Sequence, residues 1–206
     1  MSNRPRTQRS TSALRCPQPK EADLNDPLNL ACFSEPHWRV IAQGFQTETW
    51  FEDGQAVGAG GIVNPNPEDL RVGQKYYRFA SSTSGYDAQV GGGWWIDYEN
   101  FATIRSFANR NGYGLEYAAR LFLALPYAWT RVDRLVTASL EVPLRAYAGQ
   151  GKVASHNSEK WTPIQHLKVR QLYVPGLYKR GARTQLYQTA FPKPQINYVA
   201  SMKAAK

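Results

Sequence analysis

Hydrophobic residues fall into short runs over the first half of the chain, and polar segments containing glycine or proline separate those runs. Runs of this length that are rich in aromatic and β-branched residues predict β-strands, which we place at 37–42, 47–51 and 75–80. Residues 52–55 have the composition of a turn. The small and polar segment 81–93 predicts a loop that borders a cleft.

The pattern changes to a helical period in the middle of the chain. Apolar residues recur there at three- and four-residue spacing, at Phe101, Ile104, Phe107 and Ala108. Asp97 or Asn100 is expected to cap this helix, and Asn111-Gly112 to end it. A similar stripe predicts a second helix over 115–125, which Pro126 stops. Both stripes indicate helices that pack on a sheet.

Strand-like runs return in the second half of the chain, at 135–142, 144–147 and 168–174. A loop rich in glycine and serine, over 148–165, separates the last two runs. No repeat period or heptad accompanies these elements. Strands, then helices, then strands predict an α+β fold.

The length of 206 residues fits one compact domain, because domains typically contain about 100–200 residues. We predict a single domain of a catalytic type over 29–180. Residues 1–28 are polar, contain proline and lack aromatic residues, which is typical of a flexible basic lead or linker. Residues 181–206 are predicted to form a basic C-terminal extension.

The formal charge of +9 is concentrated at the two ends of the chain. Residues 1–20 and 179–206 hold eleven of the 25 basic residues and no acidic one. The central segment 21–178 therefore contains 14 basic and 16 acidic residues and is close to neutral. Basic tails of this kind bind RNA, DNA or an acidic partner by counterion release, and equally often they are solvated termini. One functional hypothesis is therefore a non-enzymatic, basic nucleic-acid-binding or phage-associated protein.

The composition disfavours several classes of protein. No run approaches the roughly 18 apolar residues that span a bilayer, so no membrane association is expected. The N-terminus has no hydrophobic stretch after its arginines, which argues against a secretory signal peptide. The two cysteines and three histidines show no metal-ligand spacing, so no metal site is predicted. A phosphate-binding loop of the Gly-Lys-Ser/Thr type is absent from the sequence.

Arg78 is the most informative polar residue, because it lies within the aromatic run 76–79. A half-buried guanidinium needs an anionic partner, since its desolvation otherwise costs several kcal/mol. No acid lies nearby in the sequence before Asp87, so the partner is either a distant structural acid or a bound ligand. A phosphate or a carboxylate suits its planar fork of donors. Further along, the glycines at 91–93 allow a close backbone approach beside the flat Trp94-Trp95 pair.

Three strand contexts follow one another in an order that carries a further signal. The first is Tyr76-Tyr77-Arg78-Phe79, an arginine after aromatic residues. The second is Gly93-Trp94-Trp95-Ile96-Asp97, followed by the predicted helix, and the third is Arg170-Gln171-Leu172-Tyr173-Val174-Pro175-Gly176. Over roughly residues 70–180 this order resembles the mono-ADP-ribosyltransferases, especially bacterial toxin domains of the interbacterial and polymorphic type.

The resemblance implies a cleft for NAD that two small antiparallel β-sheets form and helices flank. NAD would be the substrate. Arg78 would hold its phosphate and ribose, and Trp94 or Trp95 would line the nicotinamide pocket. The residues that match cofactor-binding positions of the family are Tyr77, Arg78, Phe79, Gly93, Trp94 and Trp95.

Gln171 occupies the position at which the late strand of this family carries its catalytic acid. Glutamine can orient a nucleophile or a ribose hydroxyl, but it has no charge to stabilise an oxocarbenium-like ribose. Three explanations stay open: the acid is Glu159 or Glu141, the chain is an inactivated variant, or the fold serves binding alone. The resemblance implies that Gln171 faces the same cleft as Arg78 and Trp95.

The function that the resemblance implies is an NAD-dependent mono-ADP-ribosyltransferase, a bacterial toxin or effector that modifies a macromolecular acceptor, either protein or nucleic acid. Such a toxin acts in the cytoplasm of the target cell after delivery by a secretion system, and a cognate immunity protein would be a partner. A further hypothesis is a hydrolase or glycosidase that uses Asp97, Glu141 or Glu159.

Overall fold

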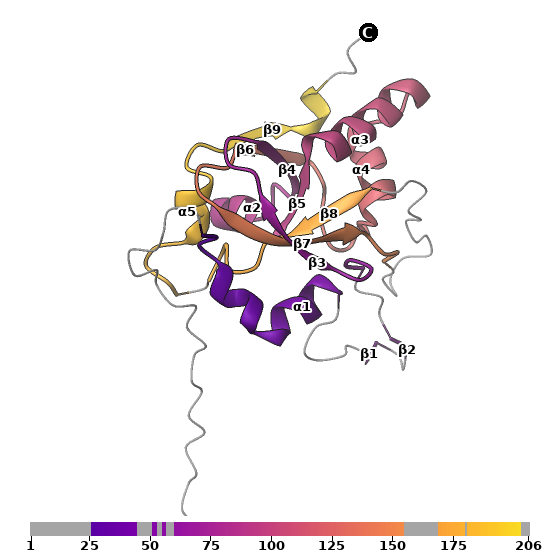
Figure 1. Ribbon diagram of the computed structural model, residues 1–206. Coiled ribbons are helices and arrows are strands. Elements are labelled where there is room, and N and C mark those ends of the chain that lie inside the picture. The colour runs from indigo at the N-terminus through magenta and orange to yellow at the C-terminus, as the bar shows by residue number, and fades with distance from the viewer. Residues whose placement is uncertain are drawn as a thin grey trace, which may run out of the picture.

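Seven antiparallel strands hydrogen-bond into one sheet at the centre of the protein, in the order β3-β7-β8-β5-β4-β6-β9 (Figure 1). The computed structural model describes residues 26–44, 51–52, 55–56, 60–154, 169–179 and 181–202. The strands of this sheet are β3 Asn66–Leu70, β4 Lys75–Ala80, β5 Trp94–Asp97, β6 Arg134–Ser139, β7 Leu144–Gln150, β8 Arg170–Tyr173 and β9 Gln195–Tyr198. A separate two-stranded pair consists of β1 Phe51–Glu52 and β2 Gln55–Ala56.

Helices cover both faces of the sheet. They are η1 Leu30–Ser34, α1 Pro36–Ala42, α2 Tyr86–Gly91, α3 Tyr98–Asn111, α4 Leu115–Leu123, α5 Leu186–Ala190 and η2 Val199–Ser201. One hydrophobic cluster, which includes Tyr77 and Phe101, joins α3 and α4 to one face. A second cluster, with Val90 and Tyr187, joins α2 and α5 to the opposite face. A third, around Tyr173, packs η1 and α1 against β7 and β8. The predicted α+β class is confirmed.

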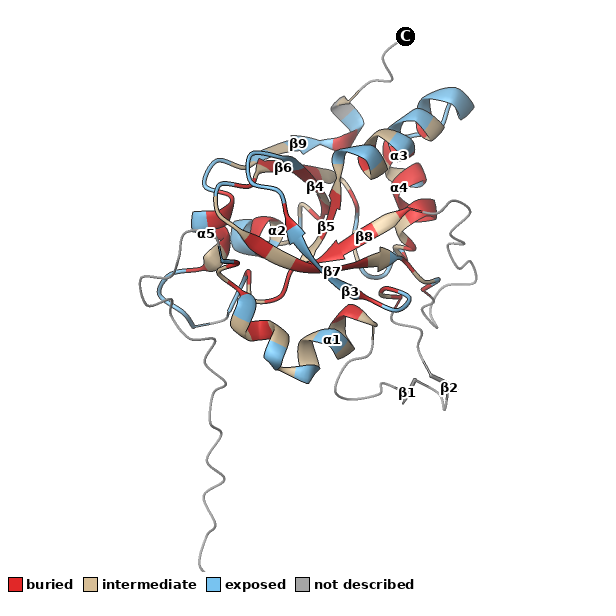
Figure 2. Ribbon diagram, viewed as in Figure 1, coloured by how far each residue is buried: buried red, intermediate tan, exposed pale blue. Residues whose placement is uncertain are grey.

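Burial is greatest in the strands at the middle of the sheet and least in its edge strands (Figure 2). The edge strand β3 is exposed at its first four residues and buried only at Leu70. Pro67, Glu68 and Asp69 suit this edge, because proline donates no hydrogen bond and charged side chains prevent pairing with another strand. Among the described residues, no helix is long and apolar enough to cross a bilayer.

Strands β4 and β5 are paired over a shorter length than most neighbouring strands of the sheet. Only two residue pairs connect these strands, Tyr76 with Asp97 and Tyr77 with Ile96. From Arg78 onward β4 pairs with β6 alone, and the first half of β5 pairs with β8. The expectation of two separate small sheets is thus corrected, because these two pairs join all seven strands into one sheet, and that sheet opens beside Arg78.

Helix α3 begins and ends where the sequence predicted. Asp97 is its N-cap, and Oδ1 of its carboxylate accepts hydrogen bonds from the main-chain N–H of Asn100 at 2.9 Å and from its side-chain amide at 2.7 Å. Gly112 ends the helix at φ +66°, a left-handed conformation that glycine adopts without steric cost. The second predicted helix is α4, which ends two residues earlier than expected, at Leu123.

Two helices lie where the sequence predicted other structure. Residues 37–42, predicted as a strand, belong to α1, in which Pro36 fills the first helical position where a missing N–H costs nothing. The loop predicted over 81–93 contains α2. The two helices have only seven and six residues, a length at which tertiary contacts rather than local propensity decide whether a helix forms.

The remaining predicted strands are present, with ends shifted by up to three residues. The strand predicted at 75–80 coincides with β4, and those at 135–142, 144–147 and 168–174 correspond to β6, β7 and β8. The strand predicted at 47–51 lies outside the described residues except for Phe51, which is in β1.

The C-terminal segment belongs to the same domain as the rest of the described chain. Strand β9 pairs with β6, and Tyr187 and Phe191 are buried in the cluster beneath α5. The predicted domain end at residue 180 is therefore corrected, because the core continues to Val199. At the other end, Leu28 and Asn29 hydrogen-bond to Pro143 and Arg145, while residues 1–25 of the predicted lead lie outside the described part of the chain.

Replacing Phe191 with alanine tests this extension of the domain. Phe191 is 1% exposed and stacks on Trp95 at a ring distance of 4.6 Å. We expect Phe191→Ala to lower the free energy of unfolding by about 3–5 kcal/mol, measured by urea denaturation, because it leaves a cavity in the core. The exposed residue Lys193 provides the matched control, and Lys193→Ala should change stability by less than about 0.5 kcal/mol. Equal stability of the two variants would place the C-terminal segment outside the core.

Candidate functional site

Arg78 ties together three elements at the point where the sheet opens. Its Nε donates to the carbonyl oxygen of Gln89 at 3.0 Å, and its Nη1 donates to that of Trp94 at 2.9 Å. Its Nη2 makes a longer contact of 3.5 Å with the carbonyl oxygen of Ala88. The guanidinium therefore holds the carbonyl end of α2 and bridges β4 to β5 where their main chains no longer pair.

The charge of Arg78 is not balanced by a carboxylate in the described part of the chain, where no acidic side chain forms an ion pair with it. Burial lowers the pKa of Arg78 to about 10, so the side chain stays charged at neutral pH. A guanidinium has five N–H donors. Three point at carbonyls, which leaves one N–H on each terminal nitrogen to bind an anion.

At each of Gly91, Gly92 and Gly93, a neighbouring side chain lies so close to the main chain that it leaves no room for a Cβ atom. A Cβ added to Gly92 would lie 2.0 Å from Nη2 of Arg78, so only glycine lets the main chain approach the guanidinium. A Cβ on Gly91 would lie 2.7 Å from the ring of Tyr187, and one on Gly93 would lie 2.7 Å from the ring of Tyr173. The close backbone approach that the sequence predicts is thus present, and Gly93 packs on Tyr173.

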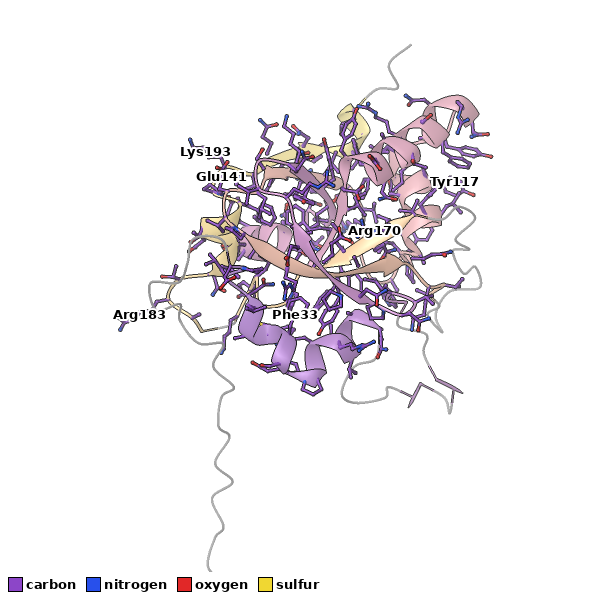
Figure 3. All side chains as sticks on the ribbon, in the orientation of Figure 1. Phe33, Tyr117, Glu141, Arg170, Arg183 and Lys193 are labelled. Atoms are coloured by element: carbon purple, nitrogen blue, oxygen red, sulfur yellow. The ribbon has the colours of Figure 1, made fainter. Side chains whose placement is uncertain are left out.

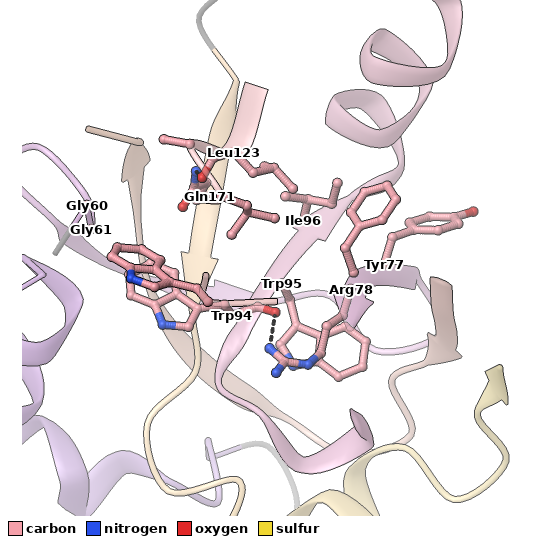
Figure 4. A pocket seen from close by; sticks show the side chains of 13 residues that line it. Gly60, Gly61, Tyr77, Arg78, Trp94, Trp95, Ile96, Leu123 and Gln171 are labelled. Atoms are coloured by element: carbon pink, nitrogen blue, oxygen red, sulfur yellow. Dashed lines mark hydrogen bonds between the residues drawn. The ribbon is translucent and has the colours of Figure 1, made fainter. Parts of the chain in front are cut away.

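A cavity of about 150 Å³ lies beside the opening of the sheet (Figure 4). It is lined by Gly60, Gly61, Tyr77, Arg78, Phe79, Trp94, Trp95, Ile96, Leu123, Ala124, Leu125, Trp129 and Gln171. Five of the six residues matched to cofactor-binding positions therefore line one cavity, together with Gln171. Gly93, the sixth, is not among the lining residues, and neither is any carboxylate of the described chain.

Gln171 is held loosely at the wall of this cavity. Its side chain is largely buried, and its Nε2 donates to the carbonyl oxygen of Leu123 at a distance of 3.4 Å. Among the described residues, this is the one hydrogen bond that the Gln171 side chain makes. Figure 4 shows Gln171 beside Leu123, across the cavity from Arg78. The amide is therefore available for a polar group of a ligand.

The strand register sends Gln171 and Arg78 to opposite faces of the sheet. Paired residues of antiparallel strands share a face, so Trp95 and Leu172 lie on one side, and Tyr77 and Ile96 lie on the other. Alternation then places Gln171 with Ile96, and Arg78 with Trp95. The expectation that Gln171 faces the same side as Arg78 and Trp95 is therefore wrong, because its side chain lies on the opposite face of the sheet. Both residues are nevertheless among those that line the cavity at the opening between β4 and β5.

The two tryptophans of β5 differ in their availability to a ligand. Trp95 is 2% exposed, stacks on Phe191 and donates its indole N–H to the carbonyl oxygen of Gly92 at 2.8 Å. It is a core residue. Trp94 is half-buried and tilted against Tyr173 at a ring distance of 5.0 Å. Of the two, Trp94 therefore has the indole that a ligand can reach.

The candidate carboxylates lie away from this cavity or beyond the described residues. Glu141 is exposed between β6 and β7, and its main-chain N–H donates to Ala190. Figure 3 shows it at the periphery, in the region of Lys193. Asp97 caps α3. Glu159 falls in 155–168, outside the described part of the chain.

A second cavity, of about 240 Å³, lies at the Asp97 end of the same strands. Its lining includes charged side chains of both signs, and several of these pair with one another or with a neighbour. Glu68 forms an ion pair with Arg170, and Asp69 forms one with Arg145. These pairs leave the larger cavity with less uncompensated charge than the cavity beside Arg78.

Sequence reasoning missed the lining residues that come from distant segments. Gly60-Gly61 and the segment after α4, with Leu125 and Trp129, reach the cavity only through the tertiary structure. One signal was present in the sequence: Trp129 lies in a short loop with proline and polar residues. Loops often carry binding residues and tryptophan is enriched at interfaces, so a tryptophan in such a loop indicates a binding surface.

Comparisons with protein-family models, with curated proteins and with solved structures found no match to this chain. The chemistry of the site therefore rests on its own geometry.

Replacing Gly92 with alanine tests the contact between the main chain and Arg78. The added Cβ would displace the guanidinium, and we expect the loss of its carbonyl contacts to cost about 1.5–3 kcal/mol of stability in urea denaturation. Gly85→Ala is the control, because an added Cβ there meets nothing within 4 Å and should change stability by less than about 0.5 kcal/mol. If Gly92→Ala is as stable as Gly85→Ala, Arg78 does not stabilise the junction of β4 and β5.

Proposed function

We propose that the protein binds NAD in the cavity beside Arg78 and transfers the ADP-ribosyl group to a macromolecular acceptor. The observation that carries this proposal is the shared cavity, because Arg78, Trp94 and Gln171 come from three strands and line one space. In this proposal the opening between β4 and β5 takes the place of a cleft between two sheets. The protein would then act as a toxin or effector, as the resemblance to the mono-ADP-ribosyltransferases implies.

The size of the cavity supports the binding of the nicotinamide end of NAD. A cavity of about 150 Å³ accommodates one aromatic ring, as an engineered cavity of that size accommodates benzene. The adenosine half must then lie outside. Arg78, with one N–H left on each terminal nitrogen, would bind the phosphates between the two halves. Trp94 would lie against the ring, and the amide of Gln171 would bond to the carboxamide or to a ribose hydroxyl.

The transfer breaks the bond between the ribose C1′ and the nicotinamide nitrogen. The electron pair of that bond leaves with the ring, which becomes neutral nicotinamide, and the acceptor nucleophile bonds to C1′ and loses a proton. Positive charge develops on the ribose in the transition state, and an oriented dipole or a carboxylate stabilises it. The described lining offers the dipole of Gln171 but no carboxylate. The carboxylate for full activity would then be Glu159, or a glutamate at position 171 if the chain is an inactivated variant.

Replacing Arg78 with lysine tests the binding half of the proposal. Lysine keeps the charge but loses the planar fork, so we expect the affinity for ADP-ribose in calorimetry to fall roughly 10- to 150-fold, equivalent to about 1.5–3 kcal/mol. Arg105→Lys is the control, because Arg105 lies over Phe101 on α3 and does not line the cavity. The same ADP-ribose affinity in both variants would remove Arg78 from the site.

The enzymatic half is tested by incubating the protein with NAD and a cell lysate. We expect free nicotinamide and a labelled macromolecule. If the chain is an inactivated variant, Gln171→Glu should raise NAD turnover by several orders of magnitude, since it restores a charge near the ribose. If Glu159 is the acid, Glu159→Ala should abolish turnover and Gln171→Glu should change it little.

Glu141→Ala is the control for this series, because the structure places Glu141 outside the cavity. Its NAD turnover should equal that of the unmodified protein. If none of the proteins releases nicotinamide, although ADP-ribose binds, the fold serves binding alone.

A further inference from the structure

Arg120 is a fully buried arginine that does not line the cavity but holds one of its walls. It lies on α4 with 1% of its surface exposed, and its terminal nitrogens donate to four main-chain carbonyls of the following loop. These carbonyls belong to Leu125, Pro126, Thr130 and Arg131, at distances of 3.1, 3.3, 2.9 and 2.8 Å. Its charge is balanced by Glu116, whose Oε1 accepts from Nε and Nη2 at 3.2 and 3.0 Å. The guanidinium thus fastens both ends of the loop to α4.

The loop from Ala124 to Val132 is strained at both of its ends. Ala124 has φ +49° and Val132 has φ +57°, a left-handed conformation that is unfavourable for any side chain and most unfavourable for a β-branched one. Such conformations cost about 1–3 kcal/mol each and persist only where the surroundings enforce them. The four bonds from Arg120 provide this enforcement. Tyr127 adds to it, because its ring lies 3.8 Å from the guanidinium carbon of Arg120.

The enforced loop brings Trp129 to the rim of the cavity. Trp129 is 41% exposed and lines the cavity, together with Ala124 and Leu125. Its six-membered ring lies opposite Gly60, where an added Cβ would be 3.9 Å from the indole. An indole held at the mouth of an apolar cavity, with part of its surface in solvent, is placed to contact a planar ligand as it enters.

We propose that Arg120 is a positioning residue that fixes Trp129 as the wall against which the planar ring of the ligand stacks. This inference rests on the proposed function, since it names the wall that receives the nicotinamide end of NAD. That ring is a pyridinium cation in the intact dinucleotide. The described lining contains no carboxylate to balance this charge, so the aromatic faces of Trp129 and Trp94 stabilise it through their π systems.

The ring half and the phosphate half of the ligand can be tested separately by calorimetry and NMR titration. The N-methylnicotinamide cation is the probe for the ring, and ADP-ribose is the probe for the phosphates. We expect Trp129→Ala to weaken N-methylnicotinamide binding about tenfold, as loss of one stacking contact does, and to change ADP-ribose binding less than about twofold. Arg78→Lys should show the reverse pattern. Tyr113→Ala is the control, because Tyr113 is exposed to a similar extent and does not line the cavity.

A double-mutant cycle separates positioning by Arg120 from a role in stability alone. Arg120→Lys cannot bond four carbonyls at once, so it should weaken N-methylnicotinamide binding about five- to tenfold in the unmodified protein. In the Trp129→Ala background the same substitution should have no further effect on ring binding. A purely structural role predicts equal losses in both backgrounds. If Arg120→Lys does not fold, Tyr127→Ala loosens the same loop from the surface and should weaken ring binding about two- to threefold.

The outcomes distinguish this inference from the proposed function. If N-methylnicotinamide binds in a manner that depends on Trp129 while NAD and ADP-ribose do not bind, the NAD assignment fails and the ring-binding wall stands. If ADP-ribose binds but Trp129→Ala leaves ring binding unchanged, the inference is overturned and the NAD assignment stands. If neither probe binds, both are overturned.

Discussion

One cation, Arg78, joins two strands of the sheet at the place where they stop pairing. Main-chain hydrogen bonds join β4 to β5 at only two residue pairs, so the rest of this junction relies on side-chain contacts. Arg78 supplies such contacts by donating to Trp94 across the gap and to Gln89 in α2. A cation at the carbonyl end of a helix is favourable, and charge-assisted hydrogen bonds are stronger than neutral ones. The same residue thus connects β4 to β5 beyond their paired residues and gives the adjoining cavity its positive charge.

The sequence predicts the long elements of this fold well and the short ones poorly. Helix α3 has a capping aspartate, an apolar stripe and a terminal glycine, and these signals agree because they are all local. Helices α1 and α2 lack such agreement. Arg78, in strand β4, donates to carbonyls in the second half of α2, at Ala88 and Gln89, so no window of sequence around α2 contains this interaction. The basic residues of the C-terminal segment predict a solvated tail, whereas Tyr187 and Phe191 within it are buried.

Some residues of the candidate site could likewise be predicted from the sequence, and others could not. Arg78 and Trp94 could be named in advance from their local sequence, and Gln171 only through the resemblance to a family, and the structure places all three at one cavity. Trp129 could not, because its position depends on the bonds of Arg120 across a strained loop. Arg120 itself falls on the second predicted helix beside its apolar stripe, where a sequence gives no sign that an arginine is buried. Tertiary hydrogen bonds to main-chain carbonyls leave no trace in the amino-acid pattern.

Arg78 and Arg120 differ in one respect that bears on function. Arg120 has a carboxylate partner, Glu116, that balances its charge, and all of its N–H donors have acceptors within the protein. Arg78 has carbonyl partners only, and no ion pair with an acidic residue of the described chain balances it. A charge that the fold leaves uncompensated beside an apolar cavity favours an anion that also carries a planar ring. The difference between these arginines, more than the presence of either one, is what makes the cavity beside Arg78 the candidate site.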